Sequence, residues 1–274
     1  MIVPSGLETA IRLGCFAVVL AFVAALEWLL PRRNRLLARR QRWPGNLAMV
    51  GIATVAARWI IPFAAIGVAA TAQARGWGLL NRVALPGWVE TGAAVIALDL
   101  VIYGQHVAFH AQPWLWRLHR THHSDPDLDV STALRFHPVE IMLSLLLKCA
   151  AVLLIGASPF AVLIFEILLN ATAMFNHGNV ALPPWFDAVL RLFLVTPDMH
   201  SVHHSIDRRE TDSNFGFNLP WWDWLFGTYR HQPAAGHDAM TIGLADFRTG
   251  RDQRIDQLLV QPLRHNVIKG ADNG

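Results

Sequence analysis

Ten of the thirteen histidines lie between His106 and His204, and their spacing could direct several imidazole rings toward one point. The first two are four residues apart. The next three form the pattern HxxHH, and a triplet ending at His204 repeats it. On a helix, residues three or four positions apart share a face. Neutral imidazole binds iron, zinc and copper, and this many rings can exceed the needs of one ion. The spacing predicts a polyhistidine site for two metal ions.

Four other histidines allow simpler interpretations. His231, His237 and His265 lie outside the dense region, and we interpret them as ordinary polar residues. His137 stands between a phenylalanine and a proline at the expected start of a helix. It could ligate a metal, orient a ligand or bind lipid headgroups, and these alternatives stay open.

The composition is that of an integral membrane protein. Of the 274 residues, 53% are hydrophobic and 16% are charged, and several apolar runs are long enough to span a bilayer. Cys15 and Cys149 lie within apolar runs without a CxxC pattern, so no disulfide is expected. We found no nucleotide-binding glycine motif. These features predict an all-α integral membrane fold with about four transmembrane helices and a cytoplasmic, histidine-rich helical metal site.

The order of apolar and basic segments predicts the topology. An arginine-rich run, Arg32–Arg42, follows the first apolar stretch. Such a run could bind nucleic acid, but beside a membrane span the positive-inside rule is favoured, so we expect no nucleic-acid partner. The N-terminus is then outside and the run cytoplasmic. The predicted single spans are 11–30, 47–72 and 89–106, and a helical hairpin follows with helices 138–155 and 159–175. This order places every dense histidine motif on the cytoplasmic side.

The remaining segments are assigned by their polarity. Residues 185–195 are too short to span and are expected in the membrane interface. Residues 219–229 are expected to pack beneath the metal domain. The predicted division is a membrane-spanning region with a basic loop (1–88), a catalytic domain (89–230) and a polar tail (231–274).

Two charged residues lie near the middle of the predicted hairpin. Lys148 and Glu166 are each nine residues from Ala157, the expected apex, which places both about 13 Å deep. An unpaired charge at that depth is costly, so we predict that they form an ion pair.

Several ordered motifs carry a resemblance to a known family. HRTHHSD, STALRFHPVE, NHGN, TPDMHSVHHS and WDWLFGTY, which lie between His119 and Tyr229, resemble the fatty acid hydroxylase/sterol desaturase superfamily. The resemblance extends over roughly 99–229, about half of the chain. It implies a membrane-embedded non-haem di-iron oxygenase that uses O₂ on a lipid. The metal ligands that it implies are His106, His110, His119, His122, His123, His177, His200, His203 and His204.

Side chains near these histidines could fix the tautomer of each ring. Hydrogen-bond acceptors beside a ligating histidine orient it and increase its basicity. The residues close enough in sequence to serve, with His137 as a further possible ligand, are Asp99, Asp125, Asn176, Asn179 and Asp198.

The predicted activity is hydroxylation or desaturation of a lipid C–H bond. Oxidising an unactivated C–H bond requires a strongly oxidising metal–oxygen species, which no ordinary side chain provides. The predicted cofactors are two iron ions, for which zinc could substitute, with O₂ as cosubstrate. We recognise no ferredoxin, flavin or haem domain, so electrons are expected from a separate donor protein. The oligomeric state stays open. The alternatives are a histidine-rich metal transporter or metal-binding protein, which should carry polar ligands through its spans, and a lipid-binding scaffold without catalysis.

Overall fold

The computed structural model describes residues 5–61 and 64–264, and those residues form helices joined by turns and loops. Within them, pairing of the strand type is limited to two isolated bridges, Pro31 with Val180 and Ser205 with Ile242. The all-α prediction is confirmed. His265, which we interpreted as an ordinary polar residue, lies outside the described residues.

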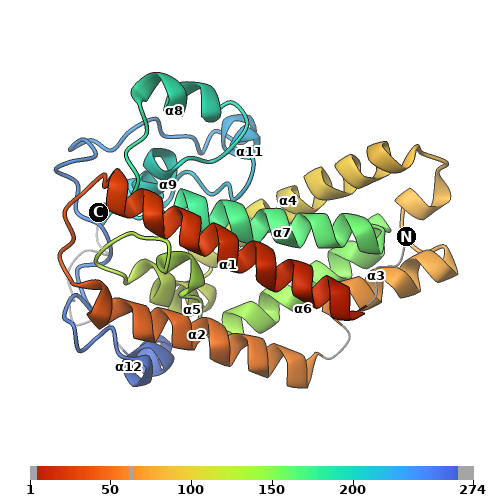
Figure 1. Cartoon of the computed structure of the whole chain (residues 1–274), viewed down its shortest axis with the longest axis horizontal. Helices are drawn as coiled ribbons and strands as arrows, with labels where there is room; N and C mark the ends of the chain where they lie inside the picture. The colour runs from red at the N-terminus through yellow and green to blue at the C-terminus, as the bar shows by residue number, and fades with distance from the viewer. Residues whose placement is uncertain (1–4, 62–63, 265–274) are drawn as a thin grey trace.

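Within the described residues, five stretches are long and apolar enough to cross a membrane, where about four were predicted. They run roughly along the long axis of the molecule (Figure 1). The helices that form them are α1 (Ser5–Leu29), α2 (Arg39–Ile60) with α3 (Ala64–Arg75), α4 (Gly87–Ala111), α6 (Pro138–Ile155) and α7 (Pro159–Asn176).

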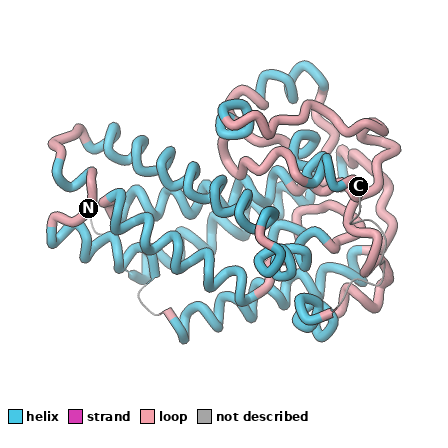
Figure 2. Tube along the Cα trace, turned by 180° about the vertical axis from the view of Figure 1, so that it is seen from behind, coloured by secondary structure: helices cyan, strands magenta, loops and turns pink. Residues whose placement is uncertain are grey.

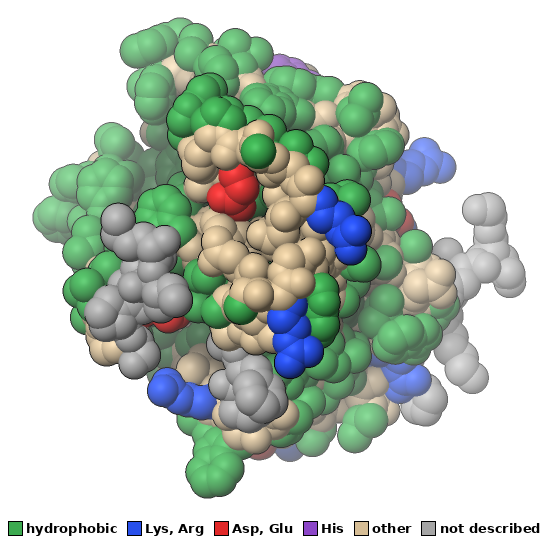
Figure 3. Space-filling model, turned by 90° about the vertical axis from the view of Figure 1, so that its right-hand side faces the viewer, with side chains coloured by type: hydrophobic (Ala, Val, Ile, Leu, Met, Phe, Trp, Pro, Cys, Tyr) green, Lys and Arg blue, Asp and Glu red, His purple; other side chains and the backbone are tan. Residues whose placement is uncertain are grey.

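The surface of these helices is suited to lipid. Only 6% to 44% of the residues in their apolar windows are buried within the protein, so most apolar side chains face outward. Trp28, Trp59 and Trp88 lie near helix ends and are about 80% exposed, as expected of aromatic residues at a membrane interface. Seen from the end near the N-terminus (Figure 3), hydrophobic side chains occupy much of the outline and charged ones are scattered.

The second predicted span differs from its prediction in two ways. Where a single helix 47–72 was expected, the structure describes α2, which ends at Ile60, and α3, which begins at Ala64; residues 62–63 lie outside the described residues. The helix also begins at Arg39, inside the run that was expected to be a cytoplasmic loop. The physical reason is that the Arg42 side chain is neutralised by buried aspartates and does not need water.

The hairpin of α6 and α7 follows its prediction closely. Gly156 ends α6 in the left-handed conformation (φ +76°), and the Ser158 side chain caps α7 by accepting from the amide of Ala161. The turn packs against the loop before η1 (Leu80–Arg82). There a Cβ on Gly78 would lie 2.3 Å from the Gly156 backbone, so this position requires glycine.

The predicted ion pair inside the hairpin is confirmed. The Lys148 ammonium donates to the Glu166 carboxylate. Arg12 of α1 adds a second cation, with its Nη2 atom 2.5 Å from the other carboxylate oxygen. The Glu166 charge is therefore shared between two cations from two helices.

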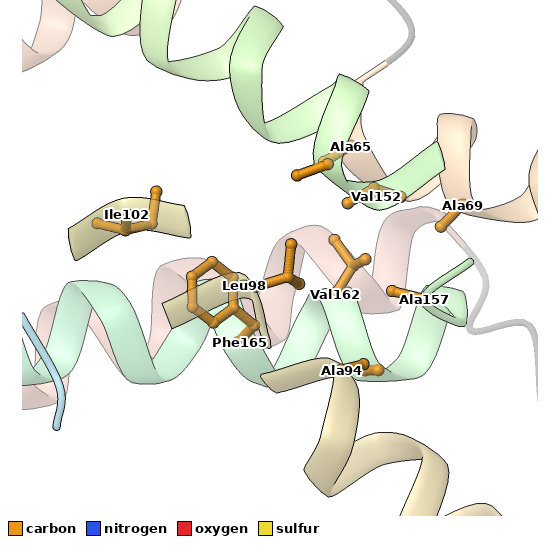
Figure 4. Close-up of a cluster of buried hydrophobic side chains, with 11 residues drawn as sticks. Ala65, Ala69, Ala94, Leu98, Ile102, Val152, Ala157, Val162 and Phe165 are labelled. Atoms are coloured by element: carbon orange, nitrogen blue, oxygen red, sulfur yellow. The ribbon is translucent and has the colours of Figure 1, made fainter. Parts of the chain in front are cut away.

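Helices α3, α4, α6 and α7 enclose an apolar core. Leu98 and Ile102 of α4 lie beside Phe165 and Val162 of α7, with Val152 of α6 opposite (Figure 4). This core fixes the direction of α4, whose last two turns carry the first histidine pair.

Short helices and loops gather at the end of the molecule opposite the N-terminus (Figure 2). The C-terminal part covers α5 rather than extending away from it, because Arg117 and Arg120 donate to the carbonyls of Pro262 and Gln261. The elements at this end are α5 (Pro113–His123), η2 (Thr132–Leu134), α8 (Pro184–Leu190), α9 (Pro197–His203), α10 (Arg208–Thr211), α11 (Trp221–Leu225), α12 (Ile255–Val260) and η3 (Gln261–Leu263).

Two apolar segments were given positions from the sequence. In α8 and the turn after it, Trp185, Val189 and Phe193 are more than half exposed, which is consistent with a position in the membrane interface. In α11, Asp223 is fully buried and accepts from the amides of Phe215 and Gly216, which anchors the segment against the histidine region.

Candidate metal centre

The structure brings together nine histidines, the same nine that the family resemblance implied, in two fully buried groups. Within each group the nearest ring nitrogens all lie within 4.8 Å of one another. We call the first group site A and the second site B. Site A consists of His106, His110, His119, His123 and His203. Site B consists of His122, His177, His200 and His204.

Each HxxHH motif is divided between the two sites. In α5 the first and last histidines (i and i+4) point into site A, and His122 points into site B. At α9 the division is reversed, since His200 and His204 belong to site B and His203 to site A. Successive helical residues are rotated by about 100°, so adjacent histidines cannot share one centre on the same face. The two motifs thereby supply two sites that lie side by side.

The tautomers of five rings follow from their hydrogen bonds. The Nδ1 atoms of His106, His177 and His203 lie 2.7–2.8 Å from the carbonyl oxygens of Phe215, Ala173 and Ser213. A carbonyl only accepts, so these Nδ1 atoms carry the proton.

Carboxylates have the same effect on two further rings. His119 Nδ1 lies 2.6 Å from Glu140 Oε1, and His110 Nδ1 lies 3.0 Å from Asp212 Oδ1. In all five neutral rings the lone pair is then on Nε2, directed into the cluster.

The spacing of the Nε2 atoms fits a bound metal ion. His106 and His119 both present lone pairs, yet their Nε2 atoms are only 3.1 Å apart. Two lone pairs at that distance repel each other unless a cation lies near both. Ligand nitrogens at about 2.1 Å from a metal are separated by about 3.0–3.4 Å, depending on the bond angle. The corresponding distances are 3.2 Å for His110–His123, 3.0 Å for His122–His177 and 3.1 Å for His177–His200.

Unpartnered ring nitrogens provide a second indication of fit. His203 Nε2 and both ring nitrogens of His204 are buried and have no hydrogen-bond partner among the residues that the structure describes. A buried polar atom without a partner is costly, and metal coordination would remove that cost. The all-imidazole donor set suits a redox-active transition metal better than magnesium or calcium, which prefer oxygen ligands.

Burial keeps the rings of these clusters in the neutral form that metals require. Desolvation lowers the pKa of His119 to about 3 and of His177 to about 4. The pKa values of His122, His123 and His204 are also well below their usual range, through burial and then through neighbouring imidazoles.

A buried network of charged side chains connects the end of α5 and the loop after it to α2. The Arg42 guanidinium contacts Asp125 (2.5 Å) and Asp129 (2.6 Å), all three with fully buried side chains. Arg135 donates to the Thr121 carbonyl and to Ser124 at the end of α5. The loop after α5 is therefore fixed to α2, which holds the HxxHH helix in place.

The acceptors predicted from sequence proximity lie elsewhere, and none hydrogen-bonds to the nine rings in the described part of the chain. Asp99 accepts from the amides of Asn218 and Leu219 and from Trp222, and so positions the loop containing Phe215 and Phe217. The others act between loops: Asp125 binds Arg42, Asp198 binds Arg32, Asn176 donates to the Phe217 carbonyl, and Asn179 exchanges hydrogen bonds with Arg33.

His137 lies outside both sites. Its Nδ1 atom accepts from the amide of Val139 as the N-cap of α6, and its Nε2 atom lies 3.2 Å from the carbonyl oxygen of Leu259. Both ring nitrogens make hydrogen bonds to the backbone, a structural role that was not among the alternatives left open from the sequence.

Sequence reasoning missed Glu140 and Asp212 as partners of the histidines. Glu140 lies three residues after His137 in the quoted STALRFHPVE motif, and Asp212 follows the second HxxHH by eight positions. Their acidic character was visible, but their contact depends on how α6 and α10 pack against α4 and α5.

Comparison with known proteins agrees with this geometry. Residues 91–228, half of the chain, match the model of the family described as fatty acid hydroxylase. No solved structure matches the chain significantly.

Three curated relatives illustrate the similarity. Alkylglycerol monooxygenase from Homo sapiens is 32% identical over 50% of this chain and 30% of its own length. An ornithine lipid hydroxylase from Rhizobium tropici is 31% identical over 53% of this chain and 44% of its own length. A Delta(7)-sterol-C5(6)-desaturase from Nicotiana tabacum is 25% identical over 83% of this chain and 84% of its own length. The chain thus spans less than half the length of the first two relatives.

The ordered histidine motifs, the two buried imidazole clusters and the match over half its length together place this chain in the fatty acid hydroxylase family.

Proposed function

We propose that this chain is a membrane-bound oxygenase that uses O₂ to hydroxylate or desaturate a lipid at two iron ions, one in site A and one in site B. The observation that carries the proposal is the pair of buried, all-imidazole clusters at one end of a bundle of apolar helices. The relatives are named for their action on an alkylglycerol, an ornithine lipid and a sterol, and these names support a lipid as the substrate class. We assign the catalytic unit to residues 89–230.

In this proposal the protein's own groups hold and tune the metal ions. The nine histidines are the ligands, and bound iron supplies the redox chemistry with O₂ that side chains lack. Glu140 and Asp212 hold the Nδ1 protons of His119 and His110, which keeps the Nε2 lone pairs directed into site A. The burial of every ligand ring excludes water from the place where a C–H bond would be oxidised.

The proposal includes an orientation in the membrane. The arginine-rich segment lies at the same end as both sites, since Arg42 binds Asp125 just after α5. If the positive-inside rule governs insertion, this end is cytoplasmic and accessible to a separate electron donor protein. Reporter fusions after Leu37 and after Gly250 should both report the cytoplasm. Opposite locations for the two reporters would refute the orientation.

The activity is tested by lipid mass spectrometry. Cells with and without the protein are grown under ¹⁸O₂, and the His122→Ala variant serves as the inactive control. A hydroxylase should yield a lipid that is 2 mass units heavier than its ¹⁶O counterpart (about 18 versus 16 added), whereas a desaturase should yield an unlabelled alkene. Equal lipid profiles with and without the protein would contradict the proposal, and metal-dependent growth without any lipid change would favour metal handling instead.

A further inference from the structure

A cavity of about 190 Å³ opens at the same end of the molecule as the histidine sites. Its walls are the segment 33–36, the turn 126–128, Asn179, the segment 240–242 and Arg248. None of the nine clustered histidines lines it. The cavity is therefore a feature separate from sites A and B.

The cavity wall carries an excess of positive charge. Arg33, Arg35 and Arg248 contribute three guanidinium groups, against the single carboxylate of Asp127. That carboxylate already accepts from the backbone amides of Leu36 (2.7 Å) and Leu37 (2.8 Å). Both oxygens of the Asp127 carboxylate therefore hold the backbone of the loop at Leu36 and Leu37.

Two of the three guanidinium groups have no ion-pair partner in the described residues. Arg33 donates through Nη2 to the carbonyl of Met240, and Arg248 donates through Nη1 to the carbonyls of Ile242 and Leu244. Arg35 has Glu27 as its partner, at 3.3 Å. The Arg33 and Arg248 side chains thus line the cavity with hydrogen bonds to neutral carbonyl oxygens only.

Buried donors at the cavity are also left without a hydrogen bond. Among the described residues, Arg33 Nη1 and Arg35 Nε are buried and have no hydrogen-bond partner, although Asp129 lies 3.9 Å from the latter. A desolvated, charged donor without an acceptor is unfavourable. Burial and then the neighbouring Arg32 lower the pKa of Arg33, and the carboxylates of Asp127, Asp238 and Asp198 offset this only in part.

We propose that this cavity is a binding site for a phosphate group. The planar fork of arginine matches the oxygens of phosphate, and three guanidinium groups supply more donors than a carboxylate can accept. A single water needs about 10–15 Å³ of such space, so the cavity has room for a phosphate group together with several waters. The phosphate can come from the headgroup of an acidic lipid or from free inorganic phosphate. The site does not depend on the metal ions or on the proposed oxidation.

The test measures binding to the purified full-length protein in dodecyl maltoside, a detergent without phosphate. Inorganic phosphate is titrated by calorimetry at constant ionic strength. In a parallel series, phosphatidate is added to the micelles, with diacylglycerol as the matched lipid that lacks the phosphate. The variants are Arg33→Gln and Arg248→Gln, and the control is Arg40→Gln, an exposed arginine of the same segment that does not line the cavity.

A second measurement uses the unmodified protein, because a variant could fail to fold. Phenylglyoxal modifies accessible guanidinium groups, and peptide mass spectrometry reports which arginines have reacted. The bound phosphate should protect Arg33 and Arg248 and leave Arg40 reactive.

The affinity for phosphate in the variants and the protection of the arginines decide whether the cavity is a phosphate site. Loss of one charged hydrogen-bonding group should weaken binding about 10- to 100-fold in each cavity variant and leave the control unchanged. Binding of inorganic phosphate supports a site for free phosphate, and binding of phosphatidate but not of diacylglycerol or inorganic phosphate supports a headgroup site. If neither probe binds, or if neither protects Arg33 and Arg248 in the unmodified protein, the proposal is wrong.

Discussion

Replacing Glu140 with leucine should weaken metal binding at site A and leave site B unchanged. Glu140 Oε1 lies 2.6 Å from His119 Nδ1, and both side chains are almost completely buried. The loss of the hydrogen-bond partner of a ligating histidine lowers metal affinity about 10- to 100-fold. We therefore expect the affinity of site A for its metal ion to fall by this factor, and the affinity of site B to stay unchanged.

The assay is a competition titration of the metal-free protein with zinc and a chelator of known affinity, which resolves two binding steps. Glu140→Gln keeps an oxygen that can accept from His119, so its loss should be smaller than that of the leucine variant. Asp198→Asn is the matched control, because Asp198 binds Arg32 and makes no hydrogen bond to the nine rings within the described residues. Equal weakening of both steps in Glu140→Leu, or no weakening, would refute the division into two sites.

Two further predictions concern charge and pH. Glu166→Gln should lower expression and thermal stability more than Lys148→Met. The glutamine leaves two cations without a counter-charge within the membrane region, whereas Arg12 still neutralises Glu166 in the methionine variant. Equal effects of the two substitutions in a thermal melt would contradict the shared ion pair. Burial lowers the pKa of His119 to about 3 and of His177 to about 4, so between those values and the ordinary 6.5 the unfolded chain binds more protons than the folded one. The metal-free protein should therefore lose stability as the pH falls below about 6.5, and a melting temperature that stays constant from pH 7 to pH 5 would argue against neutral buried rings.

The sequence predicted features that depend on local spacing and on hydrophobicity. The apolar runs gave the positions of α1, α6 and α7, and the i, i+4 spacing of His106 and His110 correctly placed both rings on one face of α4. The pairing of Lys148 with Glu166 followed from the symmetry of a hairpin.

Features that depend on packing between distant elements were not predictable in the same way. The division of adjacent histidines between two sites follows from how α5 and α9 face each other. Arg42 lies inside a helix because Asp125, 83 residues later in the chain, neutralises it. Sequence proximity selected Asp99 as a histidine partner, whereas the carboxyl groups that contact site A belong to Glu140 in α6 and to Asp212 just after α10.

The central claim is that two neighbouring clusters each hold one metal ion, and adjacent histidines test it most directly. His203 belongs to site A and His204 to site B. Metal content per chain is measured by mass spectrometry with an inductively coupled plasma, for the purified protein and for alanine variants at both positions, with His231→Ala as the control.

We predict about two ions per chain in the unmodified protein and in the control, about one in each single variant and close to none in the double variant. Zinc in place of iron would not alter this count, because both metals accept imidazole ligands. A single ion in the unmodified protein, or a full complement in His203→Ala and His204→Ala, would contradict the claim.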